Sequence, residues 1–284
     1  MCQACSGSAQ LRKRRLITKN DLSPEERRAF ESMLAQYRDA LQPIESAIED
    51  WASGADPEDL TSLESIREQM NLLVDGRVGE FEAVFREAGR EGAQAGRAVA
   101  ARQHQLAINF GVVPDRTLDI IDDWAEEAAD STLETITEDA TRWLRGAHED
   151  GLSIPDIADQ LNDELFEGRL EDYVAERAAR TGTISTSNTG SHSAFEDAES
   201  VVGEEWLATD DNRTRDDHIE ADGQVVAIDQ SFEVGGVYGA HPGDPSLPVG
   251  QIVQCRCTVL PVFGDDLTEE QLESVLDGER IWIR

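Results

Sequence analysis

The sequence predicts an α+β fold, with a long, mainly helical N-terminal region followed by a compact, turn-rich α+β module with a small antiparallel sheet. Two observations lead to this prediction. Apolar residues recur at helical spacing through the first two thirds of the 284 residues. After about residue 200, short apolar runs bounded by Gly, Pro and Asp replace that pattern. The change indicates two structurally different parts of the chain.

Caps and prolines mark the expected helix starts. Ser23-Pro24-Glu25-Glu26 combines a candidate N-cap, a proline at the first helical position and acids in the first turn. Pro43 should end or kink the helix that follows. A second helical pattern begins at Asp56-Pro57-Glu58 and contains glycines that indicate breaks or close packing. A third helix is expected from Asp115.

The later segments are shorter. Helices are expected after Gly151 and again up to Arg180. The polar Thr/Ser/Asn/Gly stretch that then runs to Ser193 is left open as loop or helix. Strands are expected at 205–208, 223–228 and 252–263, an irregular segment at 235–248 and a short helix from Thr268. These segments indicate five parts: a flexible basic arm (1–19), a helical region (20–150), a helical lead-in (151–200), the α+β module (201–265), and a C-terminal helix and tail (266–284).

The charge is strongly acidic, with 59 Asp+Glu against 25 Lys+Arg and a net charge of -34. Such a chain repels itself in dilute buffer, whereas in molar salt the Debye length falls to about 3 Å and the repulsion is screened. Only Lys13 and Lys19 are lysines. This acidic, lysine-poor composition resembles that of proteins from extremely halophilic archaea or their viruses; the alternative is a mesophilic acidic protein.

The composition also excludes some function classes. A chain of this charge repels nucleic acid as a whole, which excludes a protein that coats DNA. No apolar run approaches the length of a membrane span, and no secretory signal is expected at the N-terminus. Residues 1–19 differ because they contain no acid. Their basic residues are expected to form a flexible, positively charged arm: Arg12, Lys13, Arg14, Arg15 and Lys19.

The densest run of special residues lies at 206–257. Asp211, Arg213 and His218 fall within eight residues of one another and could be catalytic. They could equally form a polar network that holds a small β module together. No nucleophile–base pair is evident, so the residues favour the network, no catalytic residue is assigned, and the chain is not expected to be an enzyme.

The same run resembles the signature of the phage Mu F-type minor head proteins, the head morphogenesis family of tailed viruses. The resemblance extends over about 150–263, and Gln254 departs from it where the family usually has Asn. The residues that match the family motif are Trp206, Thr209, Asp211, Arg213, His218, Gly223, Pro242, Gly243, Asp244, Pro245, Cys255, Arg256 and Cys257.

The resemblance implies a portal-associated minor head (capsid) protein with basic-arm residues that contact the portal or DNA. Together with the acidic charge, it indicates a haloarchaeal tailed virus or provirus. Its expected location is the inside of the virion head near the portal vertex, and the host cytoplasm during assembly. The expected partners are the portal protein, the capsid interior and, through the arm, packaged DNA; no membrane is expected. Its expected roles are head assembly and DNA packaging or ejection. The alternative is a metal- or His-dependent hydrolase or nuclease carried in the virion.

A structural zinc site is a further expectation. Cys255 and Cys257 are two residues apart, which is a weaker zinc spacing than Cys-x(2–4)-Cys. In some relatives the position of His218 is Cys, and this exchange of one ligand type for another suggests a metal. Candidates for a fourth ligand are His241, Asp211 and Asp217. The alternative is a pair of buried, reduced cysteines beside a hydrogen-bonded histidine. Cys2 and Cys5 receive no role.

Overall fold

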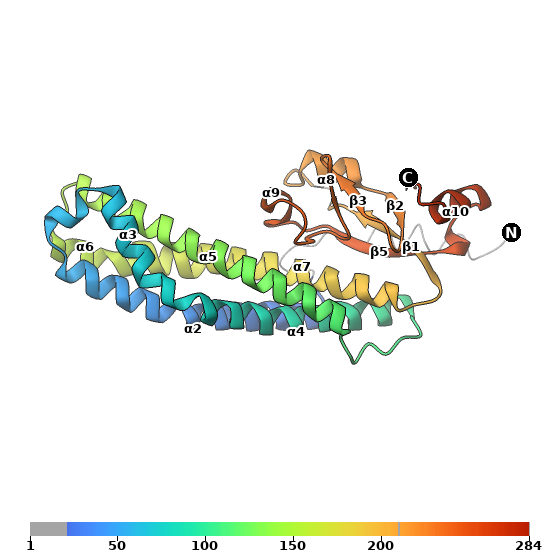
Figure 1. Ribbon diagram of the computed structural model, residues 1–284, viewed down its shortest axis with the longest axis horizontal. Coiled ribbons are helices and arrows are strands. Elements are labelled where there is room, and N and C mark those ends of the chain that lie inside the picture. Colours follow the sequence, from blue (N-terminus) through green and yellow to red (C-terminus); the bar gives the residue numbers. More distant parts are fainter. Residues whose placement is uncertain (1–21, 210, 284) are drawn as a thin grey trace. The chain divides into compact units, whose positions relative to one another are not determined.

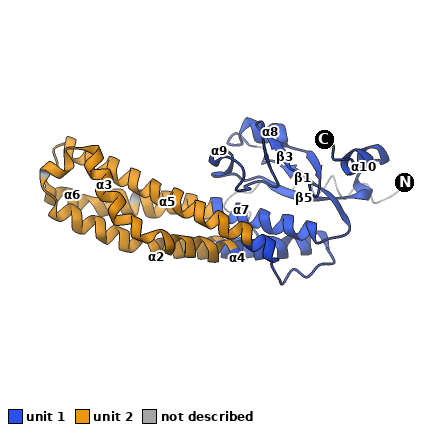
Figure 2. Ribbon diagram, in the orientation of Figure 1, with its two compact units in different colours: residues 1–29, 90–118, 181–284 blue, residues 30–89, 119–180 orange. Residues whose placement is uncertain are grey.

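The computed structural model describes residues 22–209 and 211–283. The expected basic arm, with Arg12, Lys13, Arg14, Arg15 and Lys19, lies outside the described residues. The chain forms two compact units: unit 1 comprises residues 1–29, 90–118 and 181–284, and unit 2 comprises residues 30–89 and 119–180 (Figure 2). The expected boundaries near 150, 200 and 265 stay predictions.

The described residues up to Glu196 are mainly helical, as expected (Figure 1). In chain order the helices are α2 (Pro24–Gly54), η2 (Pro57–Leu60), α3 (Leu63–Val74), η3 (Asp75–Arg77), α4 (Val78–His104), α5 (Asp115–Glu149), α6 (Ile154–Gln160), the π-helical η4 (Leu161–Val174) and α7 (Ala175–Glu196). Within the described residues, no helix is long and apolar enough to cross a membrane.

Helix α2 does not end at Pro43, so one of the two outcomes expected for this proline is wrong. An interior proline removes a backbone hydrogen bond at a cost of about 3 kcal/mol. Leu41, Ile44 and Ile48 flank it at helical spacing and are all fully buried. Burying such side chains stabilises by about 1.5–3 kcal/mol each, which outweighs the proline penalty.

The core of unit 2 is partly aromatic. Tyr37 of α2 meets Phe81 of α4 edge-on, with ring centroids 5.4 Å apart. Phe85 meets Trp124 of α5 in the same way at 5.6 Å. Edge-to-face pairs add about 0.5–1.5 kcal/mol beyond the area that they bury. Burial raises the pKa of Tyr37 well above its ordinary value.

Unit 1 contains an antiparallel four-stranded sheet of order β5-β1-β2-β6, which confirms the expected α+β class. Its strands are β1 (Val201–Leu207), β2 (Gln224–Ala227), β5 (Thr258–Phe263) and β6 (Ile281–Trp282). Around it lie α8 (Asp216–Ala221), the hairpin β3 (Phe232–Val234) and β4 (Val237–Gly239), α9 (Val249–Ile252), η5 (Gly264–Asp266) and α10 (Glu269–Leu276). Thr268 caps α10, as expected, through a hydrogen bond from the Gln271 amide.

Two local expectations in this part of the chain are wrong. The segment 235–248, expected to be irregular, begins with the turn of a β3–β4 hairpin and contains strand β4; Gly235 and Gly236 form the turn with positive φ, at 59° and 80°. Such a pair forms the tight turn whose twist matches that of antiparallel strands. The strand expected from residue 252 begins only at Thr258, and α9 and a turn replace its first half.

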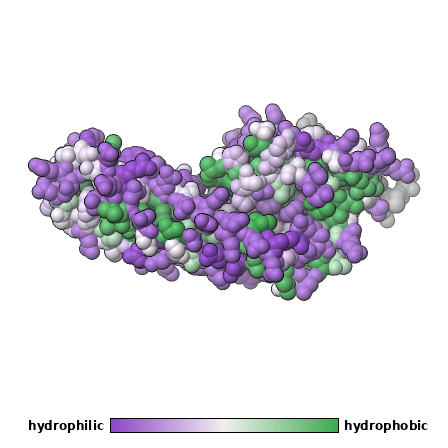
Figure 3. All heavy atoms as spheres, viewed as in Figure 1, coloured by the Kyte–Doolittle hydropathy of each residue, from purple (hydrophilic) through white to green (hydrophobic). Residues whose placement is uncertain are grey.

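The core of this unit surrounds Trp206 of β1, which is fully buried. Its ring meets Phe232 of β3 edge-on at 5.5 Å. Val226, Cys257 and Ala194 belong to the same buried cluster, so helix α7 and the sheet share one core. In contrast to this core, hydrophilic side chains cover most of the displayed face in Figure 3, as the acidic composition requires.

Candidate functional site

The polar stretch that the sequence left open is a buried helix. It forms the second half of α7, and its side chains are almost inaccessible to solvent. Hydroxyl groups satisfy their own hydrogen bonds within the helix: Thr186 Oγ1 donates to the Gly182 carbonyl at 2.8 Å, and Thr189 Oγ1 to the Ser185 carbonyl at 3.0 Å. These two hydroxyl groups are therefore buried with a hydrogen bond made, whereas the buried Thr183 Oγ1 has no hydrogen-bond partner among the described residues.

Glycines allow α4 and α7 to pack backbone against backbone. A Cβ atom on Gly96 of α4 would overlap the Ser187 carbonyl, and one on Gly190 of α7 would overlap the Ala93 carbonyl. The glycines in the second helical pattern therefore have two roles. Gly76 lies in the break η3, whereas Gly96 marks close packing.

The matched motif residues lie on β1, on α8 and in the loops around the sheet, all within unit 1. The Asp211 carboxylate accepts hydrogen bonds from both terminal nitrogens of Arg256, each at 2.5 Å. Arg256 lowers the pKa of Asp211 well below its usual range, chiefly through these bonds. Thr209 Oγ1 donates to the Arg256 carbonyl at 2.8 Å, and the Arg213 amide donates to Asp211 at 2.9 Å. The loop after β1 is thereby tied to the Cys-Arg-Cys segment.

The remaining motif residues shape turns. Gly223 has a φ of 73° and donates its amide to the Trp206 carbonyl at 2.9 Å. Gly243, in the Pro242–Pro245 turn, has a φ of 82°, and a Cβ atom there would collide with Ser185 of α7. Asp244 closes the turn by accepting the Ser246 amide at 2.8 Å. These contacts are those of a structural network.

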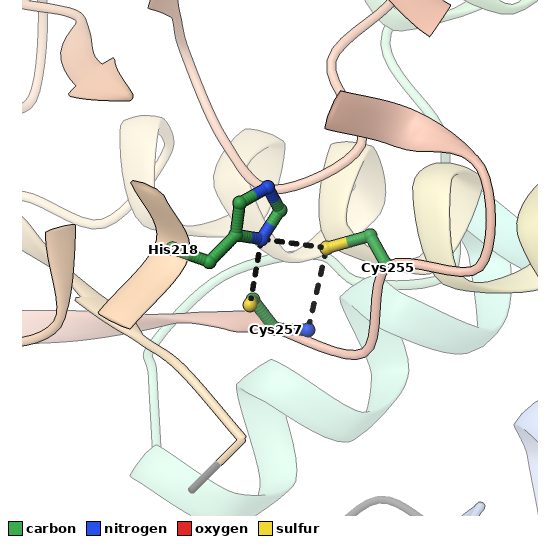
Figure 4. Close-up of side chains that lie close together, drawn as sticks. All are labelled: His218, Cys255 and Cys257. Atoms are coloured by element: carbon green, nitrogen blue, oxygen red, sulfur yellow. Dashed lines mark hydrogen bonds between the residues drawn. The ribbon is translucent and has the colours of Figure 1, made fainter. Parts of the chain in front are cut away.

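His218, Cys255 and Cys257 form the one cluster of metal-ligand type among the described residues (Figure 4). His218 Nδ1 lies 3.2 Å from Cys257 Sγ and 3.6 Å from Cys255 Sγ. All three side chains are buried, with exposed fractions of 1–3%. The contact with Cys257 lowers the pKa of Cys255, whereas the contact with Cys255, together with burial, raises that of Cys257.

The second ring nitrogen of His218 is held from the other side. Its Nε2–H donates to Gln251 Oε1 at 2.9 Å, and Gln251 Nε2 donates to Asp217 Oδ2 at 2.7 Å. The three candidates for a fourth ligand lie elsewhere. Asp217 engages Gln251, Asp211 engages Arg256, and His241 Nδ1 donates to the Pro242 carbonyl at 3.3 Å.

The fold also buries a histidine–glutamate pair to which the sequence assigned no role. His192 Nδ1 on α7 lies 2.7 Å from Glu204 Oε2 on β1, and Glu204 is fully buried. The His241 ring lies 5.6 Å from that of His192. Burial alone would lower the pKa of His192, but the charge and hydrogen bond of Glu204 raise it. A strand with both faces covered has no alternating pattern, so nothing in the sequence identified Glu204 as buried.

Gln254 stands where the resembled family usually has Asn, and its backbone gives a physical reason for that preference. Gln254 has a φ of 55°, in the left-handed region that Asn adopts several times more readily than most residues. Its amide donates to Thr181 Oγ1 at 3.0 Å, which ties this turn to α7.

These residues can be compared with known proteins. Residues 140–260 match the family model described as Phage Mu protein F like protein. This range contains the expected segment except for its last residues, and it supports the resemblance that the motif indicates.

Two curated relatives match parts of the chain. The uncharacterized protein YqbB of Bacillus subtilis (strain 168) is 29% identical over 178 residues, which cover 59% of this chain and 56% of that protein. The NAD(+)–arginine ADP-ribosyltransferase EFV of Enterococcus faecalis (strain ATCC 700802 / V583) is 31% identical over 116 residues, which cover 40% of this chain and 23% of that protein. The matches thus span about half and a quarter of these relatives. No solved structure matches significantly.

Proposed function

We propose that this chain is a minor head protein of a tailed virus, located inside the head near the portal and acting in head assembly and DNA packaging or ejection. The observation that carries the proposal is the match of residues 140–260 to the Phage Mu protein F like family. The contacts agree with it, because the motif residues hold one folded module together. A module of this kind is suited to presenting a rigid surface to the portal or capsid.

The geometry does not favour the alternative of a hydrolase or nuclease. Both oxygens of Asp211 are engaged by Arg256, and both ring nitrogens of His218 have partners. His218 is also only 1% exposed. A general base needs a free lone pair within hydrogen-bond reach of a substrate. The activity in the name of EFV is not proposed for this chain, because the match covers only 23% of that protein.

The acidic composition supports a halophilic host, and we include a haloarchaeal virus or provirus in the proposal. It also bears on the basic arm. Five phosphate contacts would give a log–log salt slope of about -4.5, so a tenfold rise in salt weakens DNA binding by roughly 10⁴–10⁵. Arginine retains its directional hydrogen bonds when long-range fields are screened. The arm is therefore proposed as a docking peptide for the portal first and a DNA contact second.

The test is the composition of purified virions. The chain should be found in them and should bind the portal protein in molar KCl. Deletion of residues 2–19 should weaken portal binding. A control variant, Arg67→Gln with Arg142→Gln, removes two exposed charges elsewhere and should bind normally. Absence from virions would overturn the head-protein proposal. Unchanged portal binding with loss of DNA binding at ~3 M salt would overturn the proposed order of the arm's roles.

A further inference from the structure

The three side chains of the His218–Cys255–Cys257 cluster come from two segments that the fold brings together. His218 lies on α8, and both cysteines lie in the segment that leads into β5. Histidine nitrogen and cysteine sulfur are the two ligand types that zinc prefers in proteins. Neither segment has much core of its own, because α8 spans six residues and the turn before β5 spans five.

The spacing of the donor atoms fits tetrahedral zinc. With Zn–N near 2.0 Å and Zn–S near 2.3 Å, tetrahedral geometry requires an N···S separation of about 3.5 Å. The two observed separations from His218 Nδ1 are 3.2 and 3.6 Å. An ordinary buried pair of thiols does not require both sulfur atoms to converge on one ring nitrogen.

The hydrogen bond of His218 Nε2 also directs the lone pair of Nδ1 towards the two sulfur atoms. Gln251 Nε2 donates to Asp217, which orients the amide so that Gln251 Oε1 faces His218. An amide oxygen only accepts, so Nε2 of His218 carries the proton, and Nδ1 presents its lone pair to the two sulfur atoms. A partner that holds the second ring nitrogen is the usual support of a metal-ligating histidine.

We propose that His218 Nδ1, Cys255 Sγ and Cys257 Sγ bind one Zn²⁺ ion, and that Gln251 and Asp217 position the histidine. Binding displaces one proton from each thiol to solvent, and a water molecule completes the tetrahedron. The ion fastens α8 to the start of β5. Asp217 and Gln251 line a surface hollow of about 520 Å³, so the two positioning residues, rather than the ligands, face solvent. This site does not depend on the head-protein proposal.

The full chain, purified in molar KCl, should hold about one zinc per chain by elemental analysis. The variant Cys2→Ser with Cys5→Ser is the control, because neither cysteine is among the proposed ligands; it should keep the ion. Cys255→Ser and His218→Gln should lose it. Cobalt in place of zinc should give a thiolate charge-transfer band that disappears in Cys255→Ser. A chelator should lower the melting temperature, and added zinc should restore it.

The positioning residues have their own measurement. Gln251→Leu should weaken zinc binding 10–100-fold in a chelator competition, whereas Gln230→Leu, at an exposed position, should not. This variant keeps all three ligands, so it tests the site even if the ligand variants fail to fold. A zinc-free chain without a cobalt–thiolate band, or an ion lost only from the Cys2/Cys5 variant, would overturn the proposal. Equal affinities of Gln251→Leu and Gln230→Leu would overturn the positioning role.

Discussion

Asn188 of α7 donates a hydrogen bond to the Cys257 carbonyl at 3.0 Å, at the point where β5 begins. The same amide group donates to the Pro242 carbonyl at 2.9 Å, and its oxygen accepts from Thr258 Oγ1 at 3.1 Å. Asn188 is 4% exposed. One buried side chain thus holds a helix, a proline-rich turn and the Cys-Arg-Cys segment in register.

Replacing Asn188 with Ala should destabilise unit 1 by about 2–6 kcal/mol, because two buried carbonyls each lose a donor and each lost partner costs about 1–3 kcal/mol. Urea unfolding in molar KCl measures the difference. Asn71→Ala, at an exposed position of α3, is the matched control and should change stability by less than about 0.5 kcal/mol. Equal stability of the two variants would show that the hydrogen bonds of Asn188 do not stabilise unit 1.

The packing of α4 on α7 can be tested with one pair of glycine substitutions. Gly96→Ala should destabilise the protein by at least about 1–3 kcal/mol, because the added Cβ overlaps the Ser187 carbonyl. Gly146→Ala, in α5 with nothing within 4 Å of its new Cβ, should stabilise by up to about 1 kcal/mol. Thermal unfolding distinguishes the two, and the same sign for both would contradict the observed close approach.

Gln254→Asn should raise stability by up to about 1 kcal/mol. Left-handed backbone costs most residues about 1–2 kcal/mol, and Asn relieves part of that cost through its short polar side chain. The substitution leaves the amide that donates to Thr181 in place. Gln230→Asn, at an exposed position, serves as the control and should have little effect. A destabilised Gln254→Asn variant would mean that the Gln side chain itself is needed.

His241 should make stability depend on pH. Burial lowers its pKa from 6.5 to about 4, so between these values the unfolded chain binds a proton that the folded chain does not. The contribution of the neutral His241 to the free energy of unfolding is therefore fully present above pH 6.5. It is lost as the pH drops towards about 4, and its size is on the order of 3 kcal/mol. The charged groups around His241 are Asp244, His192 and Glu196.

The measurement compares unfolding of the wild type and His241→Gln across this pH range. The wild type should lose stability relative to the variant as the pH falls. His192 and Glu204 act in the opposite sense, because both pKa values are raised and their contribution falls as the pH rises. His148→Gln, on α5, is the control. Parallel curves of unfolding free energy against pH for the wild type and His241→Gln would contradict a buried, neutral His241.

Folding should require high salt. At a net charge of -34 the folded chain repels itself until salt shortens the Debye length to a few ångström. Circular dichroism in ~0.1 M and ~3 M KCl should show native helix content only at the higher concentration. A full native signal in dilute buffer would contradict the halophilic interpretation.

Local patterns were sufficient to predict much of the fold. Asp115 marks the start of α5, and Thr268 caps α10, because caps and apolar periodicity act over a few residues and are visible in the sequence. The motif at 206–257 indicated a polar network, and two of its residues, Asp211 and Arg256, do form a hydrogen-bonded ion pair. Helix α2 continues through Pro43, because the burial of apolar side chains on both sides of the proline outweighs the cost of its missing backbone hydrogen bond.

By itself, the sequence determined the α+β class, the acidic composition and the motif at 206–257, which lies within the residues that match the family model. Only the tertiary structure decided that residues 181–193 are helix, because glycines of α4 bring a second backbone against them and exclude water. It also decided that Cys255 and Cys257 converge on His218, and that Glu204 is buried against His192. Such contacts join segments that are far apart in the chain or covered on both faces, and no local pattern encodes them.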